Sequence, residues 1–497
     1  MGGLPVLKFD PLNIQKFSDE ALKVIEFITN YYKNVQKYPV RSQVEPGFLQ
    51  NVYPKTAPLQ PTSLETILQE IQNDIIPGIT HWQSPNFFAF FPATISNAAF
   101  HGEMLCTALN VVGFNWICSP AATELEMIVM DWLAKLFNLP QSFLFAGEGG
   151  GVIQGSTSEG LICVLSAARD KALKQFGEDA ITKLVVYASD QTHFVVQKAA
   201  KLVGIPSKNF RVIPTSLSNQ FAVTPKAVEV AVERDVESGL MPFFLCATVG
   251  ATPSGSTDPI EGLGLLAQKY GLWFHIDAAY AGSALICPEL RHYLIGTEHA
   301  NSISMNLHKW FLTNLDCSGL WVKNRSDLLD TLSMTAEVMR NDASESKNVV
   351  DFMDWQIASG RRFRALKLWL VLRRYGVQNL MIHIRSDIEL AKHLEALVKS
   401  DQRFEVVVPV KFSLVCFRLK PEKQQGEESL KELNWKLMEA VNSSGRAYMT
   451  HAVLGDIFVI RCAIGTSLTE EKHVNGLWEL IQEKTQLVLK ERLVMGN

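Results

Sequence analysis

The sequence predicts an α/β protein with a mainly parallel central sheet, an N-terminal helical arm and a C-terminal α+β small domain. Between residues 97 and 366, short apolar runs alternate with amphipathic helical segments, which is typical of parallel strands joined by crossover helices. The chain has 497 residues, whereas a single core stops growing at roughly 250–300 residues. We therefore expect an arm over 1–96, a large α/β domain over 97–366 and a small domain over 367–497.

The N-terminal arm is expected to be helical. Ser18 is a predicted N-cap, with Asp19 and Glu20 in the first turn and apolar residues following at helical spacing. Residues 64–75 predict a second helix. Such an arm has too little apolar surface for a core of its own, so we expect it to pack on a second subunit.

The large domain is expected to place its functional residues at one edge of the sheet. Buried strands are predicted at 183–187, 243–247, 272–276 and 318–322, with helices at 224–238 and 260–270. In open parallel sheets the active residues lie at the carboxyl ends of the strands.

The last part of the chain changes character. Apolar runs at 404–408, 413–417 and 457–461 predict strands, and a long helix is expected from about residue 468. A polar segment at 420–428 reads as a linker. The pattern predicts a small α+β domain.

The composition argues against nucleic acid and membranes as partners. Charged residues make up 20 % of the chain and the net charge is −4, so no basic surface for phosphates is expected. No apolar stretch approaches the ~20 residues of a membrane span, and the N-terminus lacks the pattern of a signal peptide. The eight cysteines form no CxxC pair, which predicts free thiols, no metal site and a cytoplasmic location.

Asp277 and Lys309 are the residues that indicate most directly which cofactor the protein binds. Asp277 follows a predicted strand in His-Ile-Asp-Ala-Ala-Tyr, and Lys309 ends the string Ser-Ile-Ser-Met-Asn-Leu-His-Lys. A lysine amine forms a Schiff base with the aldehyde of pyridoxal phosphate, and a carboxylate keeps the pyridine nitrogen protonated. A helix cap or a salt bridge would also satisfy a buried carboxylate at 277. Together the two residues predict a pyridoxal-phosphate enzyme.

A glycine- and serine-rich segment is the predicted phosphate site. The glycine-rich run 147–151 precedes Gln-Gly-Ser-Thr-Ser-Glu at 154–159, which opens a predicted helix. Backbone amides and hydroxyls at a helix N-terminus favour an anion, although a plain turn is the alternative for this segment. His193 follows a predicted strand, where its ring would stack on a flat cofactor or simply bond to the loop backbone.

Six strings of the sequence point to one family. They are Thr-His-Trp-Gln-Ser-Pro at 80–85, Ser-Pro-Ala-Ala-Thr-Glu-Leu-Glu at 119–126, the glycine-rich 149–155, His-Ile-Asp-Ala-Ala-Tyr-Ala at 275–281, His-Lys-Trp at 308–310 and Asp-Trp-Gln-Ile at 354–357. On these strings the chain resembles, over nearly its whole length, the group II pyridoxal-phosphate decarboxylases acting on aromatic amino acids, and the plant members most of all. It departs at Leu307, where relatives carry Pro or Ala, a change that we expect to be tolerated. The resemblance implies fold type I (aspartate aminotransferase-like) and a homodimer with the active site at the subunit interface.

The resemblance also implies a role for each matching residue. Lys309 and His193 are the implied catalytic residues, and Gly360 reaches in from the partner subunit. The implied cofactor-binding residues are Thr157, Ser158, His193, Thr248, Asp277, Ala279, Asn306, His308, Lys309 and Gly360. The implied substrate-binding residues are Trp82, Phe90, Phe91, Pro92, Val112, Phe114, His193, His308 and Gly360.

Position 338 decides the predicted reaction. Amine-forming relatives carry a Tyr there, which protonates the substrate carbon after carbon dioxide leaves. Here the string is Thr-Ala-Glu-Val-Met at 335–339, and Val338 has no proton to donate. A positioned general acid is typically worth roughly 10²–10⁴-fold in rate, so the electron-rich carbon should survive long enough for O2 to oxidise it. Hydrolysis then gives an aldehyde, ammonia and hydrogen peroxide, as in the aromatic acetaldehyde synthases, which lack this Tyr.

Two other functions remain open at this point. If His193 or a water molecule protonates the carbon, the protein is an ordinary aromatic amino-acid decarboxylase that releases the amine. A non-catalytic binding protein would be expected to lack a cofactor residue, and Lys309, Asp277 and His193 are all present.

The predicted substrate is an aromatic L-amino acid, with phenylalanine first, tyrosine or dopa next and tryptophan last. Phe90 stands where many relatives have Tyr, beside Phe91. A wall without that hydroxyl favours an unhydroxylated ring, because an unpaired buried polar group costs about 1–3 kcal/mol. A better-packed apolar wall is the alternative interpretation of Phe90, and Gly360 leaves space for an indole. Aldehydes of this kind suggest a role in plant specialised metabolism.

Overall fold

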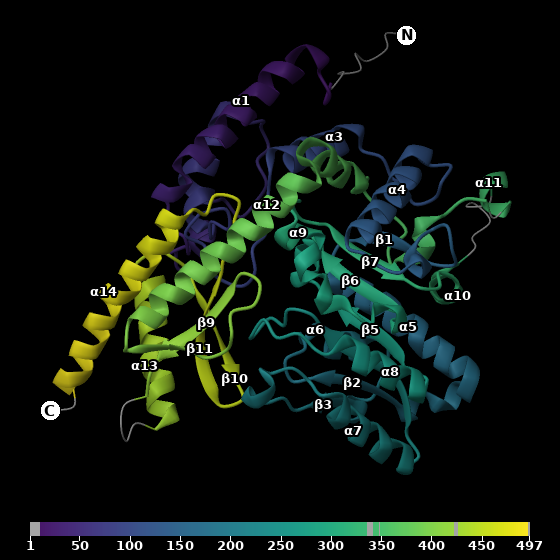
Figure 1. Cartoon of the computed structure of the whole chain (residues 1–497). Helices are drawn as coiled ribbons and strands as arrows, with labels where there is room; N and C mark the ends of the chain where they lie inside the picture. The colour runs from purple at the N-terminus through teal and green to yellow at the C-terminus, as the bar shows by residue number, and fades with distance from the viewer. Residues whose placement is uncertain (1–9, 335–340, 347, 422–425, 496–497) are drawn as a thin grey trace, which may run out of the picture.

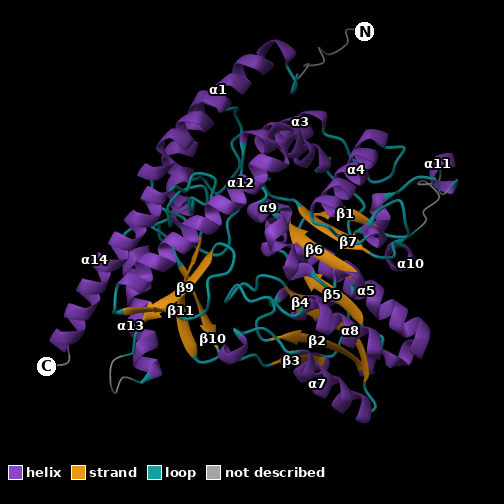
Figure 2. Cartoon of the chain, viewed as in Figure 1, coloured by secondary structure: helices purple, strands orange, loops and turns teal. Residues whose placement is uncertain are grey.

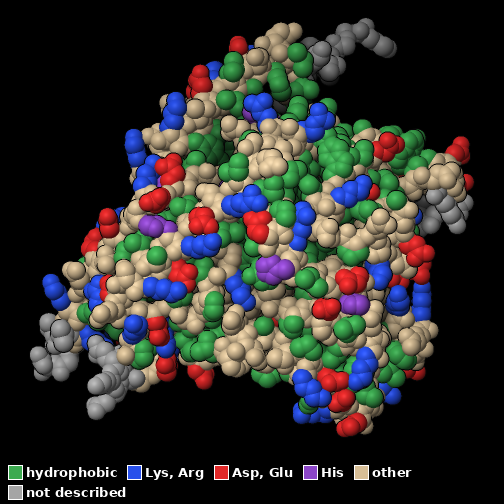
Figure 3. All heavy atoms as spheres, in the orientation of Figure 1, with side chains coloured by type: hydrophobic (Ala, Val, Ile, Leu, Met, Phe, Trp, Pro, Cys, Tyr) green, Lys and Arg blue, Asp and Glu red, His purple; other side chains and the backbone are tan. Residues whose placement is uncertain are grey.

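The structure is a computed structural model that describes residues 10–334, 341–346, 348–421 and 426–495. Within these ranges, no helix combines the length and the apolar character that crossing a membrane requires. Acidic and basic side chains are interspersed over the face shown in Figure 3, and hydrophobic side chains gather over the first helices of the large domain. The mixed surface agrees with the small net charge of −4.

The central sheet has seven strands in the order β1-β7-β6-β5-β4-β2-β3 (Figures 1 and 2). They are β1 (Gly150–Gln154), β2 (Leu184–Ser189), β3 (Phe210–Ile213), β4 (Met241–Thr248), β5 (Trp273–Asp277), β6 (Ser302–Asn306) and β7 (Ser318–Val322). Strand β7 pairs antiparallel with β1 and β6, and the remaining pairs are parallel. The predicted mainly parallel sheet is confirmed, and the four predicted strands correspond to β2, β4, β5 and β7.

Both faces of this sheet are buried, because successive side chains of a strand point to opposite faces. Val185 and Tyr187 of β2 join one apolar core, whereas Leu184 and Val186 join the other. The helices of this part are α3 (Asn97–Leu109), α4 (Pro120–Leu136), α5 (Thr157–Phe176), α6 (Val195–Leu202), α7 (Pro225–Glu237), α8 (Ile260–Tyr270), α9 (Leu307–Trp310), α10 (Ser326–Leu332) and α11 (Asp342–Glu345). The helices predicted at 224–238 and 260–270 are α7 and α8.

The C-terminal part folds around an antiparallel sheet with the strand order β10-β11-β9-β8. Its elements are β8 (Phe404–Val406), β9 (Leu414–Leu419), α13 (Glu427–Asn442), β10 (Thr450–Leu454), β11 (Ile457–Ala463) and α14 (Glu471–Met495). Helix α12 (Ala365–Ser400) leads into this part and is interrupted at Gly376, where φ is +67°. Because α12 crosses residue 366, the domain boundary placed there stays a prediction.

The N-terminal arm is helical, but its first helix begins earlier than predicted. Helix α1 (Ile14–Asn34) is capped by Asn13, whose side chain accepts a hydrogen bond from the backbone N–H of Lys16. The cap predicted at Ser18 is wrong, because Asn13 caps the helix one turn earlier and Ser18 lies inside it. The predicted second helix is α2 (Leu64–Glu70), which continues as a π-helical turn to Ile75.

Candidate active site

A cavity of about 130 Å³ lies at the carboxyl ends of the parallel strands. Strands β4, β5 and β6 end there at Thr248, Asp277 and Asn306, and Lys309 follows in α9. The predicted cofactor residues that line this lysine cavity are Thr157, Ser158, His193, Thr248, Asp277, Ala279, Asn306 and Lys309. Residues far apart in the sequence therefore converge where an α/β sheet places its ligands.

Lys309 carries the amine of this site. Burial lowers the pKa of the Lys309 amine, while the nearby carboxylate of Asp277 opposes that shift. The amine lies 5.5 Å from the centre of the Phe91 ring. A lysine with a lowered pKa is more often unprotonated, and only the unprotonated amine attacks a carbonyl carbon.

Asp277 offers a carboxylate to the same cavity. Its Oδ1 accepts the backbone N–H of Ala279 at 2.9 Å, and no donor to Oδ2 occurs among the residues that the structure describes. The side chain is 4 % exposed, and a buried carboxylate oxygen needs a partner. The protonated nitrogen of a pyridine ring fits that requirement.

The N-terminus of α5 forms the polar end of the cavity. Ser156 caps this helix, and its side chain accepts a hydrogen bond from the N–H of Glu159. The hydroxyls of Thr157 and Ser318 donate to Oδ1 of Asn306 at 2.7 and 2.6 Å, which leaves the amide N–H groups of Asn306 available to an acceptor. Hydroxyls, an amide and a helix N-terminus together suit a phosphate group.

His193 and Thr248 complete the lining. The Nδ1 atom of His193 accepts the N–H of Val195 at 3.2 Å, which places the proton of the neutral ring on Nε2. Burial lowers the pKa of His193, so the ring is neutral at pH 7. The hydroxyl of Thr248 is buried and has no hydrogen-bond partner in the described part of the chain, so a ring with a polar substituent would satisfy it. The residues present thus fit pyridoxal phosphate.

Aromatic residues form a wall beside the lysine cavity. The ring of Phe91 stacks on Tyr280 with 3.7 Å between centroids, and Trp82 stacks on Phe90 at 5.5 Å. Pro92, the next residue along the chain after Phe91, is buried. Trp82 and Phe90 remain 38 % and 45 % exposed, so in one chain this part of the predicted substrate pocket is open.

Eight predicted site residues do not line the lysine cavity within a single chain: Trp82, Phe90, Phe91 and Pro92 of the aromatic wall, and His308, Val112, Phe114 and Gly360. His308 is held elsewhere, since its Nδ1 accepts the N–H of Cys317 at 3.0 Å and burial lowers its pKa to about 4. Val112 is exposed, Phe114 is half-buried and neither lines the cavity. Their roles, and that of Gly360, stay predictions, because a second subunit would complete a shared site. Val338 lies outside the described residues.

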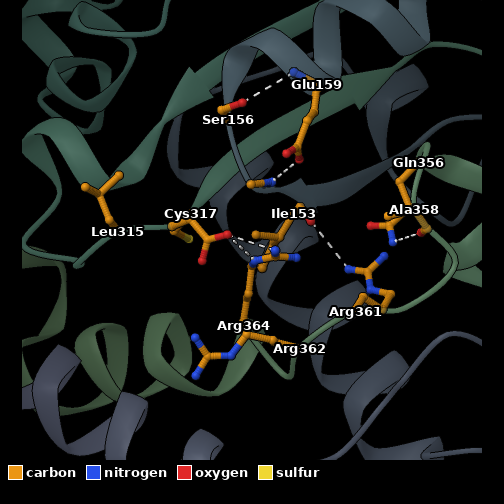
Figure 4. Close-up of polar contacts among 12 residues, drawn as sticks. Ile153, Ser156, Glu159, Leu315, Cys317, Gln356, Ala358, Arg361, Arg362 and Arg364 are labelled. Carbon is orange, nitrogen blue, oxygen red and sulfur yellow. Dashed lines mark hydrogen bonds and ion pairs between the residues drawn. The ribbon is translucent and has the colours of Figure 1, made fainter. Parts of the chain in front are cut away.

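Arg361, the residue after Gly360, donates a hydrogen bond to the backbone carbonyl of Ile153 in β1 (Figure 4). The buried Arg361 donates from Nη2 to both oxygens of Glu126 at 2.5 and 2.6 Å, and Glu126 also accepts the N–H of Ile153 in β1. Gly360 itself is exposed, with open space where a Cβ would stand. The buried contacts of Arg361 therefore hold this segment against the sheet, while Gly360 next to it remains exposed to solvent.

Several lining residues escaped the sequence analysis. Ser156, Val195, Gly250, Thr252 and Tyr280 also line the cavity. Tyr280 directly follows Ala279 in a string already singled out, so adjacency was a usable signal. Thr252 follows β4 without any motif, and only the folded chain brings it to the site.

Comparisons with known proteins agree with this geometry. Residues 46–420 match the family model described as the pyridoxal-dependent decarboxylase conserved domain. Tyrosine decarboxylase of Papaver somniferum is 54 % identical over 510 residues, which cover 98 % of this chain and 100 % of that protein. Phenylacetaldehyde synthase of a Rosa hybrid cultivar is 54 % identical over 484 residues, covering 96 % and 95 %. The crystal structure of Catharanthus roseus tryptophan decarboxylase with L-tryptophan has a TM-score of 0.93 at 55 % identity, covering 97 % of this chain and 100 % of that one.

Proposed function

Because this chain belongs to the pyridoxal-phosphate-dependent decarboxylases of fold type I, we propose that it is an aromatic aldehyde synthase. The proposed reaction converts L-phenylalanine, O2 and water into phenylacetaldehyde, carbon dioxide, ammonia and hydrogen peroxide. The observation that carries the proposal is Val338. Overall identity does not choose the product, since the tyrosine decarboxylase and the phenylacetaldehyde synthase are both 54 % identical to this chain.

The lysine cavity supplies what the first half of the reaction needs. Bound pyridoxal phosphate provides an electron sink for the substrate carbon that loses carbon dioxide. Lys309 would hold the cofactor through its amine. Asp277 would keep a proton on the ring nitrogen, and Thr157 with Asn306 would hold the phosphate.

The second half of the proposed reaction depends on the absence of a proton donor at position 338. A valine has no ionisable group, so it gives no proton to the substrate carbon after carbon dioxide leaves. Without a general acid worth roughly 10²–10⁴-fold in rate, protonation slows and oxidation by O2 competes. Oxygen takes two electrons to become hydrogen peroxide, and water hydrolyses the resulting imine to the aldehyde and ammonia.

A second candidate function is an ordinary decarboxylase that releases the amine. The observation that favours it is His193, which lines the cavity and, with Nδ1 occupied by the N–H of Val195, carries its proton on Nε2. If that proton reached the substrate carbon, Val338 would be immaterial. The variant His193→Asn would then lose amine formation, whereas an aldehyde synthase has no amine product to lose.

L-phenylalanine is the proposed substrate, ahead of tyrosine, dopa and tryptophan. Phe91 lies beside Lys309 and Phe90 precedes it in the chain, and neither ring carries a hydroxyl. A phenol buried against such a wall without a partner would lose about 1–3 kcal/mol relative to a phenyl ring. The proposed enzyme is a dimer in which Val112, Phe114 and Gly360 come from across the interface.

The decisive experiment is product analysis with L-phenylalanine under air. We expect phenylacetaldehyde with an equal amount of hydrogen peroxide from the wild type, and phenylethylamine from Val338→Tyr. The matched control is Val338→Phe, which enlarges the side chain without adding a proton and should keep the aldehyde. Amine without peroxide from the wild type would refute the aldehyde synthase and leave the decarboxylase.

A further inference from the structure

Phe90 has a backbone conformation that a phenylalanine seldom adopts. Its φ is +52°, which lies in the left-handed region, where a bulky side chain is an outlier. A residue stays in such a conformation only when the surrounding structure holds it there, and residues of this kind cluster at sites that bind ligands. Because Phe90 belongs to the aromatic wall, the contacts that hold its backbone bear on the substrate.

The C-terminal sheet holds the segment that contains Phe90. The backbone N–H of Phe88 donates to the carbonyl of Tyr448 at 2.9 Å, and the N–H of Ala463 in β11 donates to the carbonyl of Phe88 at 2.9 Å. Two residues further along, the N–H of Phe90 donates at 3.2 Å to the side-chain hydroxyl of Thr450 in β10. The first two bonds join backbone groups, whereas the bond at the unusual backbone conformation depends on the side chain of Thr450.

The hydroxyl of Thr450 is itself fixed by the sheet. Thr450 pairs with Arg461 across the antiparallel strands β10 and β11, and its hydroxyl oxygen also accepts Nη1 of the buried Arg461 at 3.1 Å. Both acceptor positions of the oxygen are then in use. The N–H of Phe90 is therefore bound to an acceptor whose direction the sheet determines.

The ring of Phe90 contacts two other aromatic rings beside the active site. Trp82 stacks on it with 5.5 Å between centroids, and Tyr448 meets it edge-on at 5.9 Å. Phe90 and Thr450 line a cavity of about 420 Å³, and Thr252 lines both this cavity and the lysine cavity. The ring of Phe90 therefore borders a space that adjoins the lysine cavity.

We propose that Thr450 is a positioning residue, whose hydroxyl holds Phe90 in the left-handed conformation and so fixes where its ring meets the ring of the substrate. Without this bond the backbone at position 90 relaxes towards negative φ, which redirects the ring away from Trp82. The wall then admits water, so a phenol loses less there than before, because its hydroxyl stays hydrated. The inference rests on the proposed function only in taking an aromatic amino acid as substrate.

The test measures carbon dioxide release, which is common to an aldehyde and an amine product, from L-phenylalanine and L-tyrosine. Thr450→Val keeps the shape of the side chain and removes the hydroxyl. We expect it to raise KM for L-phenylalanine about 3- to 10-fold, the usual effect of one hydrogen bond, with a smaller fall in kcat. The ratio of kcat/KM for L-phenylalanine to that for L-tyrosine should fall by a similar factor, and Thr450→Ser should restore the wild-type values.

A double-mutant cycle shows whether Thr450 acts through Phe90. Glycine adopts positive φ without strain and has no ring to position, so Thr450→Val should change neither KM nor the substrate ratio in a Phe90→Gly background. An equal effect of Thr450→Val in both backgrounds would mean that the hydroxyl acts through Arg461 or the sheet, and would overturn the proposal. An unchanged KM in the wild-type background would also overturn it.

The matched control is Thr485→Val, which removes a buried hydroxyl far from the wall in the sequence. Thr485 in α14 donates to the carbonyl of Ile481 in the same helix at 2.8 Å, so both KM and the substrate ratio should stay unchanged. Release of the amine, or a preference of the wild type for L-tyrosine, would refute the proposed function and leave this inference standing, because the cycle at Phe90 is read from KM alone.

Discussion

Asp277 and Ala279 are joined by a hydrogen bond that fixes the direction of the Asp277 carboxylate. The backbone N–H of Ala279 donates to Oδ1 of Asp277 at 2.9 Å. Since Asp277 is the last residue of β5 and Ala279 already belongs to the turn beyond it, the turn itself orients the side chain. The orientation of the second oxygen, Oδ2, is therefore set by the protein alone, without a ligand.

The variant Asp277→Asn should lose activity without losing its fold. An opposite charge nearby shifts a pKa by about 1–3 units, so the cofactor ring should hold its proton about 10- to 1000-fold less well, with kcat falling by a similar factor. The measurement is kcat together with the visible absorbance of the bound cofactor. Asp258→Asn is the control, because Asp258 is equally buried but accepts the N–H groups of Val223 and Thr248. Asp258→Asn should lower the denaturation temperature of the protein and leave the cofactor spectrum unchanged. An equal loss of kcat in Asp277→Asn and Asp258→Asn would contradict the prediction.

The stability of the protein should fall as the pH drops from about 6.5 towards 4. Burial lowers the pKa of His275 and of His308 to about 4, whereas an unfolded histidine titrates near 6.5. Between these values the unfolded chain binds protons that the folded chain does not, so acid favours unfolding by roughly 3 kcal/mol per histidine at most. Denaturant unfolding at pH 7.5 and pH 5 measures the difference. His275→Gln should flatten the dependence, and a decline as steep as that of the wild type would count against burial of His275 as its cause.

The exposed apolar side of α1 should mediate dimerisation. Ile14, Phe17 and Leu22 are 70 %, 54 % and 57 % exposed in the single chain. Replacing Ile14 and Phe17 together by Asp places charges in an apolar contact, which is unfavourable, and should give monomers with little activity in sedimentation velocity and assays. Leu59→Asp is the control, since Leu59 is 97 % exposed in a loop and should leave the dimer intact. A monomeric wild type would refute the dimer altogether.

Local pattern was enough to predict the sheet and the residues at its strand ends. Asp277 ends a short apolar run that marks it as strand-borne, and Lys309 follows the next strand in α9, so their place at one edge followed from the α/β rhythm. Thr252 could not be found that way, because it follows β4 in the run Gly-Ala-Thr-Pro-Ser, which carries no motif. Only tertiary folding brings it to the cavity that Asp277 and Lys309 also line. The start of α1 was missed for a simpler reason, since Asn13 and Ser18 are equally acceptable caps.

The interruption of α12 at Gly376 makes this position sensitive to backbone shape rather than to side-chain size. Its φ of +67° and ψ of 165° belong to a region that essentially only glycine occupies. Apart from its own helix backbone and chain neighbours, no atom lies within 4 Å of the place where a Cβ would stand, so alanine would meet conformational strain and no steric clash. Even the smallest replacement, alanine, should consequently strain the backbone here, although nothing opposes its methyl group.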